Sequence, residues 1–144
     1  MERVAEGLKS KYGYQMVEVC YMSRLGPHFP EIFEKCVQNG ATSITVIPYF
    51  LHNGLHLVLD IPEMMQEQAS RYPNVELVLG KNLGFDEVLV DLVERRIADS
   101  SDFGDVRELE LPSRKKYPVP PGQQEFVPMD PEEAEKYFGT RGHH

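Results

Sequence analysis

Two histidines flank a glycine in the segment His52-Asn53-Gly54-Leu55-His56. Neutral imidazole binds divalent transition metals and accepts a proton near pH 7, and Gly54 lets the backbone come close to a flat ligand. The segment therefore predicts a metal site or a proton-transfer site. From spacing alone, two histidines in a loop are more often surface side chains or helix caps than metal ligands, because no cysteine or third histidine stands beside His52 and His56.

Three further polar residues precede or follow predicted strands or helices. Arg24 and Lys81 lie in loops and suit the binding of ligand carboxylates, although solvated surface charge explains them as well. His28, beside Pro27, either faces the same site or begins a helix. These residues extend the candidate site beyond the two loop histidines.

The cysteines and the common catalytic motifs point away from several enzyme classes. The chain has 2 cysteines, Cys20 and Cys36, which is too few for a disulfide scaffold. Both fall in apolar runs, where a free cysteine behaves as a small core residue. No Walker A loop, GxGxxG, GxSxG or CxxC is present, so nucleotide-binding, hydrolase and thiol-redox functions find no support.

Hydrophobic periodicity predicts alternating helices and strands around these residues. Alternation at this spacing is typical of a three-layer, doubly wound α/β fold, with a parallel sheet of at least three strands and helices on both faces. The predicted helices span residues 1–12, 30–39, 60–71 and 86–97, with Gly13 as the C-terminal cap of the first and Asp60 as the N-cap of the third. The apolar stripes of the helices at 30–39 and 86–97 are expected to face the core. The predicted strands span residues 16–22, 43–50 and 75–79.

The candidate residues fall in the loops that follow the strands, at residues 23–28, 52–56 and 81–85. In a parallel sheet these loops gather beyond the carboxyl ends of the strands, where ligands bind. A doubly wound fold normally begins with a strand, but this pattern begins with a helix. We therefore expect that one strand and its loop are missing from the front.

Composition changes after residue 97. Residues 98–144 are rich in proline and hold no long periodic stretch, which predicts an extended tail after an α/β domain spanning residues 1–97. One short helix is predicted near residues 131–138. Aromatic side chains such as Phe126, Tyr137 and Phe138 are expected to dock on a domain surface.

Overall composition indicates one soluble domain with a tail. The chain has 144 residues and a formal net charge of −8, which opposes general binding to nucleic acid. The longest apolar run, residues 43–59, is interrupted by Pro48, His52 and Gly54 and cannot span a bilayer. No signal-peptide pattern opens the chain. We therefore expect a cytoplasmic protein without a membrane or nucleic-acid partner.

Several short motifs, in this order, resemble the small sirohydrochlorin chelatases of the CbiX type, in the class II chelatase group. The resemblance covers about residues 1–97, and its specific part is the block from Val46 to Glu63. The motifs are Val17-Glu18-Val19, Pro27, Pro30-Glu31, Gly40-Ala41, Val46-Ile47-Pro48-Tyr49-Phe50-Leu51, Gly54-Leu55-His56, Asp60-Ile61-Pro62-Glu63 and Leu83-Gly84.

The resemblance implies insertion of a divalent metal into the tetrapyrrole sirohydrochlorin, with Co²⁺ first and Fe²⁺ or Ni²⁺ as alternatives. The metal is a substrate, and no organic cofactor is implied. His56 matches the family's histidine after a strand, a metal ligand or proton acceptor, and His52 and His28 are secondary candidates for the metal. The ligand carboxylates and the macrocycle face would contact Arg24, Leu51, Gly54, Leu55 and Lys81.

The chain also departs from the family's pattern. Members usually begin with a strand that ends in His-Gly-Ser, whose histidine is the other half of the metal site, and this sequence has no counterpart. We therefore expect slow catalysis by this chain alone, because a site with fewer ligands binds metal weakly. The small members are homodimers, so a homodimer is expected. The alternatives are a non-catalytic tetrapyrrole- or metal-binding member, or a fragment of a longer fused enzyme.

Overall fold

The computed structural model describes residues 1–22, 26–111 and 132. The chain divides into two compact units, residues 1–85 and residues 86–144. The predicted boundary between a domain and its tail at residue 97 is a different division and stays a prediction. The predicted helix near 131–138, Glu132 apart, and the predicted docking of Phe126, Tyr137 and Phe138 lie outside the described residues.

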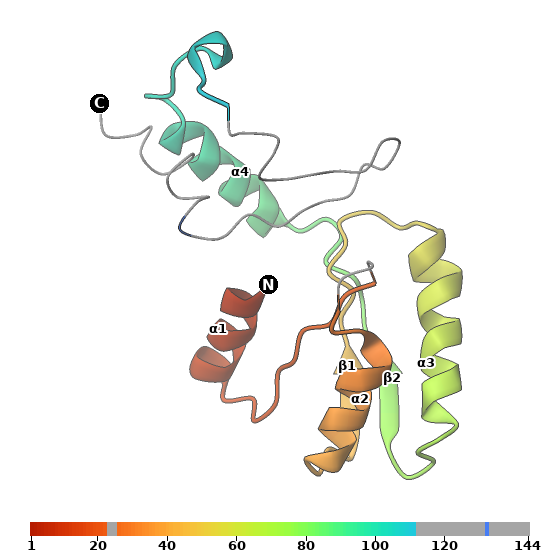
Figure 1. Ribbon diagram of the computed structural model, residues 1–144. Helices are drawn as coiled ribbons and strands as arrows, with labels where there is room; N and C mark the ends of the chain where they lie inside the picture. The colour runs from red at the N-terminus through yellow and green to blue at the C-terminus, as the bar shows by residue number, and fades with distance from the viewer. Residues whose placement is uncertain (23–25, 112–131, 133–144) are drawn as a thin grey trace. The chain divides into compact units, whose positions relative to one another are not determined.

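The first unit begins with helix α1, Glu2–Tyr12 (Figure 1). The helix ends at Gly13, which adopts a left-handed conformation with φ 73° and donates its N–H to Lys9 O at 3.0 Å. Glycine takes this conformation without the steric cost that a Cβ brings, which is why it commonly ends helices. The predicted first helix and its glycine cap are confirmed.

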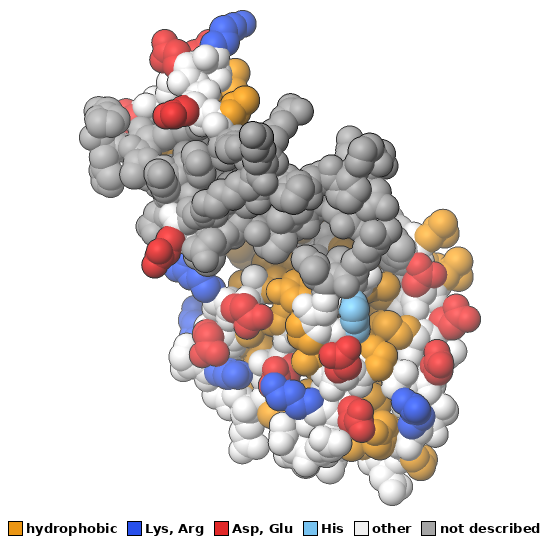
Figure 2. Space-filling model, in the orientation of Figure 1, with side chains coloured by type: hydrophobic (Ala, Val, Ile, Leu, Met, Phe, Trp, Pro, Cys, Tyr) orange, Lys and Arg blue, Asp and Glu red, His pale blue; other side chains and the backbone are white. Residues whose placement is uncertain are grey.

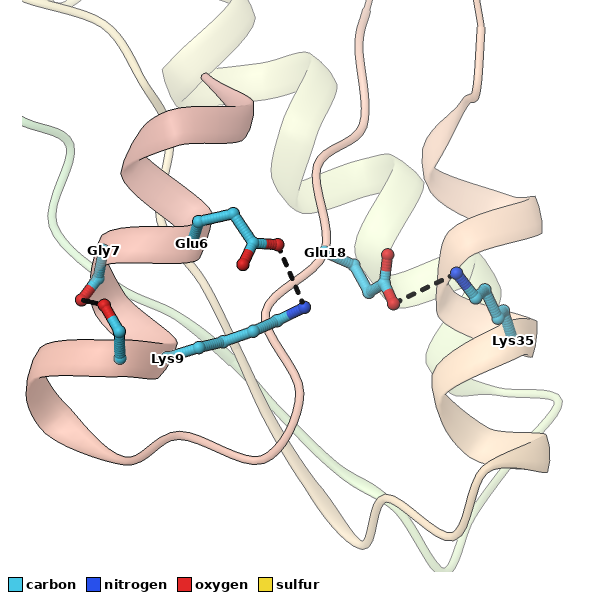
Figure 3. A network of polar contacts seen from close by, with 6 residues as sticks. Glu6, Gly7, Lys9, Glu18 and Lys35 are labelled. Atoms are coloured by element: carbon cyan, nitrogen blue, oxygen red, sulfur yellow. Dashed lines mark hydrogen bonds and ion pairs between the residues drawn. The ribbon is translucent and has the colours of Figure 1, made fainter.

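The strand predicted at residues 16–22 is wrong. In the described part of the chain, this segment belongs to no sheet, and the Tyr21 N–H donates instead to Pro27 O at 2.9 Å. The segment still lies on the core, because Cys20 packs against the buried cluster and Glu18 pairs with Lys35 at 3.0 Å (Figure 3). β-branched and aromatic composition indicates a half-buried extended segment, but a ladder also needs a pairing edge.

The core of the first unit lies between two helices and one face of a small sheet. Helix α2, Phe29–Gln38, and helix α3, Ile61–Ala69, contribute the buried side chains. Phe33 is only 1% exposed, with its ring stacked on Phe29 at 5.5 Å and in edge contact with Tyr72 at 5.4 Å. These contacts come from the apolar stripe that the helical period placed on α2.

The sheet has two described strands, β1, Ser43–Val46, and β2, Glu76–Leu79, which pair in parallel (Figure 1). Alternate residues such as Ile44 and Leu77, which are register partners, face the core. The α/β class with a parallel sheet is therefore confirmed, although the described residues hold two strands rather than three. β1 is shorter than the predicted 43–50 strand because Pro48 has no N–H to donate.

Helix α3 begins differently from the prediction. A five-residue π-helix, η1, His56–Asp60, precedes it without a break. Asp60 therefore has helical backbone angles and makes no side-chain cap hydrogen bond to α3. The predicted N-cap at Asp60 is wrong, because a capping residue needs a non-helical backbone that turns its side chain toward the first free N–H groups.

The second unit contains helix α4, Glu87–Asp99, and a short 3-10 turn, η2, Val106–Glu108. Asp86 caps α4 by accepting the Val88 N–H at 2.9 Å, which agrees with the predicted start of this helix. No residue of α4 is buried, although its apolar stripe was predicted to face the core. None of the helices in the described ranges is long and apolar enough to cross a membrane.

Candidate functional site

The candidate site lies where the chain leaves the two parallel strands. The residues after β1 and the residues after β2 run side by side and continue the strand pairing beyond the sheet. Gly80 N donates to Val46 O at 2.8 Å, and Leu83 N donates to Pro48 O at 3.3 Å. The two predicted loops at this edge therefore do meet, as the topology of a parallel sheet requires.

Among the described residues, Phe50 is the last point at which these two segments are joined by hydrogen bonds. Its carbonyl oxygen accepts the Gly84 N–H at 3.0 Å and the Asn82 side-chain amide at 3.1 Å. Gly84 reaches this position with φ 54°, a left-handed conformation that glycine adopts easily. The predicted loop at residues 81–85 included Asn82 without singling it out, because only the folded chain shows its partner 32 residues away.

A turn connects Phe50 to the π-helix. Gly54 O accepts the N–H groups of both Leu57 and Val58, at 3.0 and 3.2 Å, so His56 lies within a tight hydrogen-bonded turn. Single π-helical turns are rare in proteins, and those that occur are often found at functional sites. Sequence reasoning placed His56 in a loop and missed this turn, for which the sequence carries no simple signal.

The exposed residues around this turn are mostly apolar. Leu51 is 52% exposed and Leu55 is 73% exposed, and Ile47 and Phe85 are also open to solvent. Lys81, on the segment after β2, is exposed as well. Exposed apolar side chains on one of the two joined segments and an exposed cation on the other are the groups that a flat apolar ligand with acidic substituents needs.

Gly80 lies directly beneath the side chain of Ile47 on this surface. A Cβ built on Gly80 would lie 2.5 Å from Ile47 Cδ1, so the side chain of Ile47 occupies the space that any larger residue at 80 would need. A side chain at position 80 would therefore displace the end of the Ile47 side chain, which is exposed.

The other predicted site residues are placed as follows. His52 is exposed in the loop after β1. His28 is the N-cap residue of α2, and its Nδ1 lies 3.8 Å from Glu31 Oε1, so the structure places it at the start of a helix. Arg24 and the imidazole of His56 lie outside what the structure describes. Whether His28, His52 and His56 share a metal stays a prediction.

No group of three or more His, Cys, Asp or Glu side chains comes together among the described residues. The charges on the visible face of the first unit are also mixed, because acidic and basic side chains are interspersed with hydrophobic ones (Figure 2). The described side chains thus offer an apolar surface with scattered charges rather than a preformed multidentate cage.

Both cysteines are core residues, as predicted. Cys36 is buried on α2, and Cys20 packs against the core cluster. Burial raises the pKa of the Cys20 thiol, with a smaller contribution from Cys36, and burial followed by the charge of Glu18 raises the pKa of Cys36. A raised pKa keeps a thiol protonated and unreactive near neutral pH, which argues against a role for either cysteine in metal binding or nucleophilic attack.

Comparisons with known proteins identify relatives of the site-bearing region. The family model described as CbiX matches residues 1–100. The sirohydrochlorin ferrochelatase of Priestia megaterium is 35% identical over 96 residues, covering 67% of this chain and 36% of the relative. That of Bacillus subtilis is 38% identical over 94 residues, covering 65% of this chain and 36% of the relative.

A solved structure of a sirohydrochlorin chelatase is also similar to this chain. The sirohydrochlorin chelatase SirB from Bacillus subtilis subspecies spizizenii, in complex with cobalt, matches with a TM-score of 0.63 and 36% identity, over 68% of this chain and 42% of that chain. The chain thus spans 36% of the length of the two curated relatives. The family model's match, residues 1–100, includes the two joined loops and the π-helical turn.

Proposed function

This chain belongs to the CbiX family, and from that premise we propose that it inserts a divalent metal into sirohydrochlorin, a step of cobalamin or sirohaem synthesis. Co²⁺ is the first candidate and Fe²⁺ the second, since similar proteins include ferrochelatases and a chelatase in complex with cobalt. The observation that supports the proposal most directly is the junction of two post-strand loops beside the π-helical turn of His56, inside the matched region.

His56 is the proposed metal ligand or proton acceptor. Insertion of a metal into a tetrapyrrole displaces two pyrrole protons, so a base must lie over the ring. Neutral imidazole performs both tasks near pH 7, because it can hold a metal weakly or accept a proton. The turn at Gly54 fixes the backbone of His56.

The residues around His56 are proposed to hold the macrocycle. Leu51 and Leu55 offer apolar side chains to the ring face, and Gly54 lets the ring approach the backbone. Lys81, and Arg24 from the segment before α2, would pair with the ring's carboxylates. His52 and His28 are the secondary candidates for the metal.

The direct test follows the absorbance of sirohydrochlorin after Co²⁺ is added to the purified chain. We expect insertion above the uncatalysed background in the wild type. In His56→Ala the rate should fall to background while the circular dichroism spectrum is unchanged. His144→Ala, the same chemical change at the end of the chain, should match the wild type.

Two outcomes would overturn parts of the proposal. Equal rates for the wild type and His56→Ala, both above background, would show that another group carries the reaction. A wild type that binds sirohydrochlorin without metallating it would replace the enzyme by a tetrapyrrole carrier, the alternative reading of the sequence. A homodimer in a cytoplasmic setting is proposed by resemblance, and sedimentation at micromolar concentration would test the dimer.

A further inference from the structure

Among the residues that the structure describes, the side chain of Asn82 joins the two loops of the candidate site. Beyond the paired residues of β1 and β2, three of the links between the two described segments are made by the backbone N–H groups of Gly80, Leu83 and Gly84. Another comes from the Asn82 side-chain amide, which donates to Phe50 O at 3.1 Å. Asn82 is half-buried, whereas Phe50 is 39% exposed.

The bond from Asn82 to Phe50 O lies just before the turn that leads to His56. Pro48 has no N–H, so it cannot donate to the neighbouring segment, and Phe50 O is the last joined group before Leu51 and the turn to His56. A carbonyl oxygen has two lone pairs and can accept from both the Asn82 amide and the Gly84 N–H. The two donors together fix where the loop of His56 departs.

We propose that Asn82 is a positioning residue for metal insertion: its amide holds the loop that leads to His56 against the loop that carries Lys81. This inference rests on the proposed function. Lys81 is the neighbour of Asn82 in the chain, so the same short segment carries both the proposed carboxylate contact and the clamp. The clamp would keep the apolar surface at Leu51 and the cation at a constant separation.

Preorganisation of this kind acts on substrate binding. A loop that is already held in its binding geometry loses less conformational freedom when the macrocycle binds. Removal of the amide leaves Phe50 O with its bond from Gly84, so the fold should survive. The KM for sirohydrochlorin should rise by about 3- to 10-fold, because the loss of one hydrogen bond changes an equilibrium constant by about this factor. The kcat should stay nearly unchanged.

The variants separate the hydrogen bond from other changes at position 82. Asn82→Ala removes the donor without adding charge, and Asn82→Gln keeps an amide donor on a longer side chain. Asn74→Ala is the matched control, because Asn74 is exposed in the turn that precedes β2, at the opposite end of that strand from Asn82.

The first measurement is amide hydrogen exchange on the free protein. Asn82→Ala should exchange faster at residues 51–58, including the Leu57 and Val58 N–H groups, with β1 and α2 unchanged. Asn82→Gln should restore at least half of the lost protection, and Asn74→Ala should resemble the wild type. Unchanged exchange at 51–58 in Asn82→Ala would overturn the inference.

The second measurement is steady-state metal insertion with sirohydrochlorin as the varied substrate. The inference requires a raised KM in Asn82→Ala, a kcat within about twofold of the wild type, and recovery in Asn82→Gln. If the wild type metallates sirohydrochlorin and Asn82→Ala has the same KM, only the role of Asn82 is overturned. If the wild type neither binds nor metallates sirohydrochlorin, the proposed function fails, and this role for Asn82 fails with it.

Discussion

Helices α2 and α4 carry the same kind of sequence pattern and have opposite surroundings. Both are amphipathic, and both were predicted to face a core. On α2, Phe33 is 1% exposed, whereas on α4 Ile97 is 62% exposed and no residue is buried. A helical period therefore predicts where an apolar stripe lies on a helix, but what covers the stripe depends on contacts between distant parts of the chain.

The largest expected effect concerns the buried side of this comparison. Phe33→Ala should lower the free energy of unfolding by about 3–5 kcal/mol, because it removes a ring that contacts Phe29 and Tyr72 and leaves a cavity. That is a large part of the total stability of a small domain. Urea denaturation followed by circular dichroism measures the change.

Ile97→Ala is the matched change on α4. Its cost should stay within about 0.5 kcal/mol, as for other exposed positions. A loss of about 2 kcal/mol or more at Ile97 would break the comparison, because truncation of a side chain costs that much only where it is packed.

Local signals explain how much of the fold could be predicted. The helices were found because their periodicity depends on neighbouring residues, as does the glycine cap at Gly13 after α1. The strand predicted at 16–22 was wrong, since pairing depends on a distant edge that composition does not reveal. Asp60 had the chemistry of a cap, but the π-helix before it changed its backbone angles.

A medium effect is expected at the start of α4. Asp86→Ala removes the acceptor of the Val88 N–H and should destabilise the first turn of α4 by about 1 kcal/mol. Amide exchange at Val88 and Leu89 measures it. Because α4 buries no side chain, this cap should matter more to α4 than any single apolar contact, the reverse of the order in α2.

Asp91→Ala controls for loss of an exposed acidic residue on the same helix. Alanine is the better helix former, so α4 should be unchanged or slightly more stable in this variant. Equal destabilisation by Asp86→Ala and Asp91→Ala would show that charge, rather than the cap hydrogen bond, supports the helix.

Some features of the candidate site could be predicted from the sequence, and others depend on how the chain folds. The topology of a parallel sheet predicted that the loops after β1 and β2 would meet, and their backbone hydrogen bonds confirm it. The π-helical turn at His56 and the bond from Asn82 to Phe50 could not be predicted, because both depend on the folded path of the backbone. The metal-ligand set of His56, His52 and His28 stays a prediction.

The smallest expected effects concern two ion pairs, one in each unit. Glu18 and Lys35 lie 3.0 Å apart, with side chains 27% and 54% exposed, and join the 14–22 segment to α2 (Figure 3). Arg96 and Asp99 lie 3.3 Å apart on α4, with side chains 70% and 66% exposed. Water screens the second pair more, so the first should show the stronger coupling.

Double-mutant cycles test this order, with Glu18→Gln and Lys35→Met for the first pair and Arg96→Met and Asp99→Asn for the second. The coupling free energy should be about 0.5–1 kcal/mol between Glu18 and Lys35 and below about 0.5 kcal/mol between Arg96 and Asp99. Because added salt screens exposed charges, 1 M NaCl should reduce both couplings. If the coupling free energy between Arg96 and Asp99 equals or exceeds that between Glu18 and Lys35, the lower exposure of Glu18 does not strengthen its ion pair, and the proposed difference between the two regions is wrong.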